Sequence, residues 1–328
     1  MKIDTETNRQ SRDFLVKLAA KFIIYLDKEG LVGLKSALYL LSLAAIWGSS
    51  FLFMRLSVPT LGAAWMIELR IGLAALFLCL VAISLKKPLY LRLHWRHYLV
   101  LGLLSAALPF LCYGFAAQNL TASLMSIINA MTPIFGTAIS AMYFRQKLAR
   151  SKVIGLLLGF IGVAVIVGFD TELFTTDAWW SVLIVLGAPL CYGLSSTYTQ
   201  VVKGVEPFSN ASGTMLMGSL LVMPLLMFFS VPAAPTVVVS ASVIILGVVC
   251  TGVAYLIFFK LLNDIGTSST LTVTFLVPVF GVFWGVVFLD ETVGWHTLAG
   301  TILVLAGTVK TTGFSLRYLA KQPLTETR

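Results

Sequence analysis

Ten runs of about 20 mostly apolar residues, separated by short polar stretches, make up most of this 328-residue chain. A helix needs about 20 such residues to cross the hydrocarbon core of a bilayer. Only 11% of the residues are charged, whereas a soluble domain carries about 25%. The sequence therefore predicts an all-α integral membrane protein with ten transmembrane helices and no soluble domain. The ten runs are residues 34–56, 61–85, 97–118, 122–144, 153–169, 179–202, 211–229, 236–259, 268–289 and 295–314.

Lysine and arginine residues are distributed unevenly between the loops. They gather in the N-terminal arm, the second and fourth loops and the C-terminal tail, whereas the opposite loops carry Arg55 and the acidic Asp170, Glu172 and Asp177. Because basic residues mark the cytoplasmic side of a membrane, we expect both termini to be cytoplasmic. The same clustering beside apolar runs argues against nucleic acid as the partner of a chain whose net charge is +9.

The N-terminal arm, residues 1–33, places Lys17, Lys21 and Lys28 on one helical stripe. This pattern is typical of an amphipathic helix on the anionic inner leaflet of the bilayer. The alternative is a flexible basic arm that only enforces the topology. The pattern does not resemble a cleaved signal peptide, because the lysines interrupt its apolar stretch and no small-residue cleavage site follows.

The chain also repeats itself at a constant offset of 145 residues, without a gap. Each repeat holds five spans, and because five is odd, the second copy must cross the membrane in the opposite direction. We therefore expect two inverted five-helix repeats, residues 34–175 and 176–316, and a cytoplasmic tail, residues 317–328. The matched pairs are Gly48 and Gly193, Ser50 and Ser195, Gly102 and Gly247, Ser123 and Ser268, Pro133 and Pro278, Phe135 and Phe280, Gly136 and Gly281, Gly155 and Gly300, Gly162 and Gly307, and Gly168 and Gly313.

Inverted repeats are a recurring plan of secondary transporters. Two oppositely oriented copies of one packing unit can exchange conformations, so inward-open and outward-open states have similar free energies. The sequence holds no phosphate-binding Gly-Lys-Ser/Thr loop, no metal-ligand spacing around its three histidines, and no nucleophile–base constellation. We therefore expect a transporter that uses neither ATP nor a cofactor, and not an enzyme.

Three stretches carry a resemblance to a known family. They are Ala-Ile-Trp-Gly-Ser-Ser-Phe at 45–51, Glu-Leu-Arg-Ile-Gly-Leu-Ala-Ala at 68–75, and Pro-x-Phe-Gly at 278–281 followed by Glu291, Gly300 and Gly307. The pattern resembles the drug/metabolite transporter superfamily, EamA type, over residues 35–315. One departure is Gln146, which stands where the second repeat has Glu291 and the family often has Glu.

The resemblance implies a permease with a central cavity between its halves. Spans one, three, four, six, eight and nine would line that cavity. Members of the family export amino acids, other metabolites or drugs, and eukaryotic relatives carry nucleotide sugars or phosphorylated compounds.

Polar and aromatic residues at helical spacing indicate the walls of this cavity. In the fourth span Asn129 and Pro133 share one stripe, and a mid-helix proline frees a carbonyl that lipid cannot satisfy. Aromatic side chains with a hydroxyl or an N–H group can stack on a ligand and bond to it. Helix packing through small residues and buried aromatics is the alternative in each case. The candidate substrate-binding residues are Trp47, Ser50, Tyr113, Asn129, Thr132, Tyr192, Ser195, Tyr255 and Thr274, with Pro133 and Pro278 as helix breaks or hinges.

Three charged residues are candidates for coupling or for charge pairing: Glu68, Arg70 and Glu291. Glu68 and Arg70 are two positions apart and point to different sides of a helix, so we expect each to find another partner. We favour a bracing role near the outer surface for both, because the family places the second span away from the cavity. Proton coupling by Glu68 and an anion partner for Arg70 are the alternatives. For Glu291 we expect capping of the final helix, with an outer gate as the alternative.

An aromatic, hydroxyl-rich cavity that is poor in charge suits a neutral or zwitterionic small molecule. We therefore expect a multi-pass transporter of the bacterial inner membrane, monomeric or homodimeric, that exports an amino-acid-like metabolite by alternating access. The alternatives are an antiporter of nucleotide sugars or phosphorylated metabolites, a membrane-embedded enzyme and a non-transporting scaffold.

Overall fold

The computed structural model describes residues 34–169, 178–202 and 204–312, and over these residues all regular secondary structure is helical. The predicted arm 1–33 and tail 317–328 lie outside the described residues. The helices are α2 (Leu34–Leu61), α3 (Ala63–Ser84), α4 (Leu91–Leu101), η1 (Gly102–Ala107), α5 (Leu108–Ala116), α6 (Ala122–Asn129), α7 (Thr132–Tyr143), α8 (Arg150–Gly168), α10 (Trp179–Val201), α11 (Pro207–Val222), η2 (Met223–Phe228), α12 (Val237–Ile244), η3 (Ile245–Val253), α13 (Ala254–Thr270), α14 (Val273–Phe288) and α15 (Trp295–Thr312).

Eight helical stretches of the described chain are long and apolar enough to cross a membrane. The ninth predicted span contains α14, a shorter apolar helix, and the tenth corresponds to α15, which has 18 residues. The all-helical membrane architecture is therefore confirmed, whereas the count of ten stays a prediction. The eight stretches are Lys35–Leu61, Ala63–Ser84, Leu91–Ala116, Ala122–Tyr143, Arg150–Gly168, Trp179–Val201, Pro207–Phe228 and Val237–Gly266.

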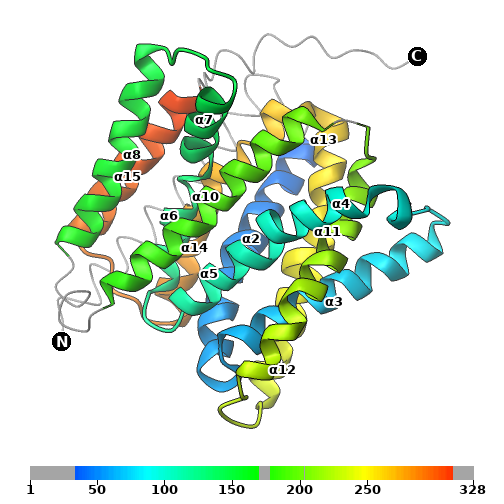
Figure 1. Cartoon of the computed structure of the whole chain (residues 1–328). Helices are drawn as coiled ribbons and strands as arrows, with labels where there is room; N and C mark the ends of the chain where they lie inside the picture. The colour runs from blue at the N-terminus through cyan, green and yellow to red at the C-terminus, as the bar shows by residue number, and fades with distance from the viewer. Residues whose placement is uncertain (1–33, 170–177, 203, 313–328) are drawn as a thin grey trace.

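The helices pack between the two predicted repeats more than within them. Helices α8 and α15 lie side by side at one edge of the molecule (Figure 1), and α2 in the centre packs against α14. Helix α10 packs against α5 and α7, and α3 packs against α11. Every one of these contacts joins a helix of residues 34–175 to a helix of residues 176–316.

The α2–α14 contact and the α10–α7 contact are built in the same way, from glycines that the repeat pairs. A Cβ atom on Gly48 of α2 would lie 2.9 Å from the backbone nitrogen of Gly281 in α14. A Cβ atom on Gly193 of α10 would likewise lie 2.9 Å from the nitrogen of Gly136 in α7. Only glycine permits helices to approach so closely, and both contacts use residues that the offset of 145 pairs.

The contact between α8 and α15 also uses paired glycines. A Cβ atom on Gly155 would lie 2.7 Å from the carbonyl oxygen of Gly307, and one on Gly162 would lie 2.8 Å from that of Gly300. The contacts run forward along α8 and backward along α15, so these helices are antiparallel. Exchanging each glycine for its partner in the repeat reproduces the same contacts.

The third and eighth spans each contain an irregular helical segment, at positions that the repeat pairs. Segments η1 and η3 are π-helical, and Gly102 of η1 corresponds to Gly247 of η3. In the fourth span a break separates α6 from α7, and Pro133 lies in the first turn of α7. Pro278 lies inside α14, which continues through it, and the break in that span lies earlier, before Val273. A hinge at Pro278 stays a prediction.

Candidate functional site

A cavity of about 320 Å³ lies among helices of both halves. Eight of the nine candidate substrate-binding residues line it, and Ser195 does not. The structure thus brings together positions that are far apart in the sequence. The lining residues are Trp47, Ser50, Phe51, Met54, Arg70, Phe110, Tyr113, Asn129, Thr132, Tyr192, Cys250, Thr251, Tyr255, Phe258, Leu271, Val273, Thr274 and Val277.

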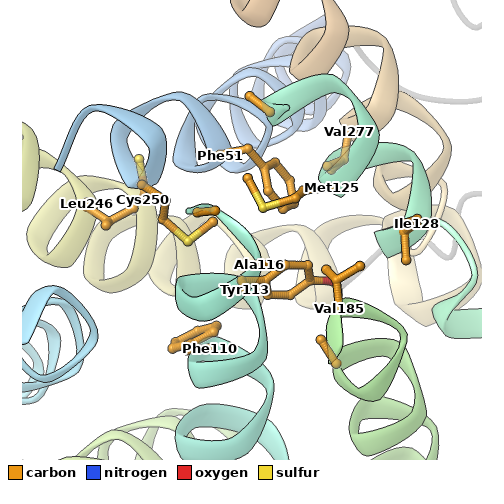
Figure 2. Packing of buried hydrophobic residues seen from close by; sticks show 14 of the residues in the cluster. Phe51, Phe110, Tyr113, Ala116, Met125, Ile128, Val185, Leu246, Cys250 and Val277 are labelled. Carbon is orange, nitrogen blue, oxygen red and sulfur yellow. The ribbon is translucent and has the colours of Figure 1, made fainter. Parts of the chain in front are cut away.

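Aromatic side chains form much of the wall. The ring of Phe51 in α2 meets the ring of Tyr113 in α5 edge to face, with centroids 5.4 Å apart (Figure 2). Trp47 packs against Phe258 of α13 at 5.6 Å. These rings give the cavity an apolar surface with fixed shape, because aromatic side chains have few rotatable bonds.

One hydrogen bond crosses the cavity wall between α5 and the broken fourth span. The hydroxyl of Tyr113 donates to Oδ1 of Asn129 at 2.8 Å. Asn129 is the last residue of α6, and the hydroxyl of Thr132 donates to its carbonyl oxygen at 2.8 Å. The break in this span therefore presents an asparagine amide to the cavity, held in place from both sides.

Several polar groups in the cavity are free to bind a ligand. Nδ2 of Asn129 and the hydroxyls of Tyr192 and Tyr255 make no hydrogen bond with the described residues. The hydroxyls of Ser50 and Thr274 are occupied, because they donate to Trp47 O at 2.6 Å and Leu271 O at 2.8 Å. A ligand would therefore meet an amide donor and two phenols rather than serine and threonine donors.

Arg70 also lines the cavity, and the bracing role near the outer surface that we expected for it stays a prediction. Its side chain is 5% exposed, and its Nε donates to Oγ1 of Thr251 at 3.2 Å. The guanidinium carbon lies 3.8 Å from the centroid of the Phe110 ring. Inserting an arginine at the centre of a membrane helix costs about 3 kcal/mol, and the Arg70 guanidinium is held by the cavity wall.

Glu68 points elsewhere, as the spacing of two residues predicts. Its Oε1 accepts a hydrogen bond from Ser219 of α11 at 2.5 Å, and its Oε2 is buried and has no hydrogen-bond partner among the described residues. The side chain is 8% exposed and does not line the cavity. Glu68 therefore lies at the interface of α3 with α11.

Two other candidates also lie away from the cavity. Ser195 is hydrogen-bonded to Ser105 of η1, so it joins α10 to the third span. Glu291 caps a helix, but not the final one. Its carboxylate accepts from Ala122 N at 2.6 Å and from Ser123 N at 3.0 Å and Oγ at 2.6 Å. These groups belong to the start of α6, which packs against α14. The helix that Glu291 caps is therefore α6 of the first half, and not α15, which follows it in the sequence.

The sequence analysis missed several apolar lining residues that helical spacing could have indicated. Phe51 and Met54 lie four residues after Trp47 and Ser50, and Phe258 lies three residues after Tyr255. Residues three or four apart share one face of a helix. Extending each predicted stripe by one turn, whatever the residue type, would have found them.

Comparison with known proteins also indicates a membrane transporter. The profile of the EamA-like transporter family matches residues 34–168 and 179–312. A protein of Bacillus subtilis named uncharacterized transporter YoaV is 25% identical over 279 residues, which are 83% of this chain and 95% of that protein. A protein of Salmonella typhimurium named probable amino-acid metabolite efflux pump is 23% identical over 88% of this chain and 98% of its own.

A third relative, from Streptantibioticus cattleyicolor, is named probable terminal-alkyne amino-acid exporter and is 24% identical over 84% of this chain and 92% of its own. A crystal structure that shares 16% sequence identity superposes with a TM-score of 0.60 and covers 87% of this chain and 98% of that one. The structural likeness supports the fold, and the profile covers both halves of the chain. The protein therefore belongs to the EamA-like transporter family.

Proposed function

We propose that this protein exports a small amino-acid-like metabolite, neutral or zwitterionic, by alternating access. The observation that carries the proposal is the cavity of about 320 Å³ between the two halves, with an aromatic wall and a few free polar groups. Ligand sites are commonly apolar pockets with a small number of fixed polar groups. The names of two relatives, an amino-acid exporter and an amino-acid metabolite efflux pump, favour the same substrate class.

The packing between the halves supports alternating access. The α2–α14 and α7–α10 contacts use equivalent glycines, and the α8–α15 contact maps onto itself when the halves are exchanged. Two arrangements that differ by exchanging the roles of the halves would then have similar packing energies. Rocking of one half against the other would expose the cavity to each side in turn.

The topology in this proposal has ten spans, with both termini cytoplasmic. The concentration of lysine and arginine in the arm, tail and two loops supports this orientation. We place the protein in the bacterial inner membrane, as a monomer or homodimer that uses neither ATP nor a cofactor.

The test is uptake and counterflow in proteoliposomes, with a panel of amino acids, sugar phosphates and cationic drugs at two pH values. We expect counterflow of amino acids, and its loss in Asn129→Ala, because this change removes a free donor from the cavity. Ser105→Ala is the matched control, since it removes a polar group that lies outside the cavity. Transport of sugar phosphates without amino acids would contradict the substrate class, and a protein that moves no panel member would contradict the transport proposal.

A further inference from the structure

The guanidinium of Arg70 has no anionic partner in the described chain. The carboxyl groups of residues 34–169, 178–202 and 204–312 are those of Glu68, Glu206, Asp264, Asp290 and Glu291. Glu206 and Asp264 pair with lysines, Glu68 is bonded to Ser219, Glu291 caps α6, and Asp290 is exposed. The charge of Arg70 is thus buried, and none of the carboxylates in the described chain compensates it.

Among the described residues, the immediate surroundings of Arg70 also hold no negatively charged side chain. The titratable side chains that interact with it electrostatically are Tyr192, Cys250, Tyr255 and Tyr113. These are neutral phenols and a thiol at ordinary pH. Buried charges in proteins are normally paired, so the missing anion is the most direct indication of what enters the cavity.

The guanidinium lines the cavity and is held by groups that leave Nη2 without a hydrogen bond to the described residues. Nε donates to Thr251, whose hydroxyl donates in turn to Leu246 O at 2.9 Å in the π-helical segment η3. Nη1 contacts the sulfur of Met54 at 3.5 Å, a weak acceptor, and Phe110 covers one flat face. Two of the five N–H groups of a guanidinium are thereby used. The remaining three, on Nη1 and Nη2, can form the paired hydrogen bonds with which arginine binds a carboxylate.

From this geometry we infer that Arg70 is the carboxylate-binding residue of the cavity, and that the transported molecule is a small monocarboxylate with an apolar or aromatic body. The inference rests on the proposed transport function and redefines its substrate class, because it requires a carboxylate and admits a monoanion that has no amine. A single cation balances one carboxylate, whereas a sugar nucleotide would bring two or more negative charges to a cavity whose described lining residues include no lysine or arginine besides Arg70.

The remaining lining suits the rest of such a molecule. The rings of Trp47 and Phe258 offer apolar contact to its body. An ammonium group, where the molecule has one, can bind to the hydroxyls of Tyr192 and Tyr255 or lie over an aromatic face. Binding therefore requires the carboxylate of the transported molecule and does not require an amine.

The experiment compares acids with their amides, which keep shape and lose the anion. Purified protein in lipid nanodiscs is tested by ligand-induced shifts of the thermal unfolding midpoint and by counterflow in proteoliposomes. The probes are leucine, phenylalanine and tryptophan, their three amides, 3-phenylpropionate, which lacks the amine, and phenyl phosphate. We expect at least tenfold tighter binding of the acids than of the amides, and binding of 3-phenylpropionate.

Variants separate recognition from a structural role. Arg70→Gln should bring the ratio of acid to amide affinity close to one, and Arg70→Lys should retain part of the preference. A merely structural role would weaken acids and amides equally. Arg55→Gln is the matched control, because Arg55 donates to the backbone of Ala117 outside the cavity. If Arg70→Gln does not fold, Thr251→Val, which removes the acceptor of Nε, should lower the same ratio.

The outcomes distinguish this inference from the proposed function. Equal affinity for acids and amides, together with transport, would overturn carboxylate recognition and leave amino-acid transport standing. Tighter binding of phenyl phosphate than of 3-phenylpropionate would overturn it in favour of a phosphorylated substrate. If none of the probes binds or moves, both the inference and the proposed substrate class are wrong.

Discussion

Tyr113 and Asn129 together determine how the broken fourth span presents its amide to the cavity. Replacing Tyr113 by Phe keeps the ring against Phe51 and removes the hydrogen bond to Oδ1 of Asn129. Such a bond contributes about 0.5–1.5 kcal/mol, so we expect the KM for transport in Tyr113→Phe to rise about twofold to tenfold. The control is Tyr98→Phe, since the Tyr98 hydroxyl donates to Leu89 O away from the cavity. A KM that changes equally in both variants would contradict a local role for Tyr113.

The positions of individual site residues were predictable where they belong to a stripe on one helix. Asn129, Thr132 and Thr274 lie in the cavity because their spans turn one polar face toward the partner half. Arg70 was not predictable in the same way. The spacing of Glu68 and Arg70 shows that they face different sides, but a single helix cannot show which side meets a cavity and which meets α11.

At the scale of the helices, Glu291 connects the loop after α14 to the start of α6 in the other half. Three hydrogen bonds to Ala122 and Ser123 make this contact. Carboxylate caps of this kind stabilise by about 1–2 kcal/mol, and we expect Glu291→Ala to lower the thermal unfolding midpoint in detergent accordingly. The matched control is Gln146→Ala, because Gln146 occupies the equivalent place in the first repeat and is exposed. An equal midpoint for Glu291→Ala and the parent protein would show that the cap does not stabilise the fold.

The close approach of α2 to α14 depends on glycine. A methyl group at Gly48 would lie 2.7 Å from Cβ of Phe280 and 2.9 Å from the backbone of Gly281. Overpacking of this kind costs about 1–3 kcal/mol, which exceeds the gain of about 1 kcal/mol in helix propensity. We therefore expect Gly48→Ala to unfold at a lower temperature than the parent protein. Gly168→Ala is the control, because its methyl group would meet nothing within 4 Å, and its unfolding temperature should not fall below that of the parent. An unfolding temperature that is lower for Gly168→Ala than for Gly48→Ala would contradict this packing.

The helices themselves were predictable to within a few residues at most ends, because an isolated run of about 20 apolar residues can satisfy its backbone groups within a bilayer only as a helix. The fourth span, predicted as 122–144, extends from Ala122 to Tyr143. The breaks inside spans were less predictable. Pro133 lies beside one, whereas α14 continues through Pro278 and the break lies earlier. Both prolines carry the same local signal, and tertiary packing decides which of them coincides with an interruption.

For the molecule as a whole, the decisive property is whether the cavity opens to both sides of the membrane. Helices α6 and α14 come from different halves, and they place Asn129 and Thr274 in the same cavity. If the halves rock against each other, each position becomes accessible to water from each side in turn. A receptor, an enzyme or a scaffold with the same fold would not require access from both sides.

Cysteine labelling tests this property without knowledge of the substrate. In a background where the four native cysteines are replaced by alanine, Asn129→Cys and Thr274→Cys are exposed to a membrane-impermeant thiol reagent from either face of oriented vesicles. Alternating access predicts that both positions are labelled from both faces, since the exchange between states continues during the reaction. Ser212→Cys is the control, because Ser212 is fully buried in α11 outside the cavity. Labelling of Asn129→Cys and Thr274→Cys from one face alone would contradict alternating access, because the cavity would then open to that side only.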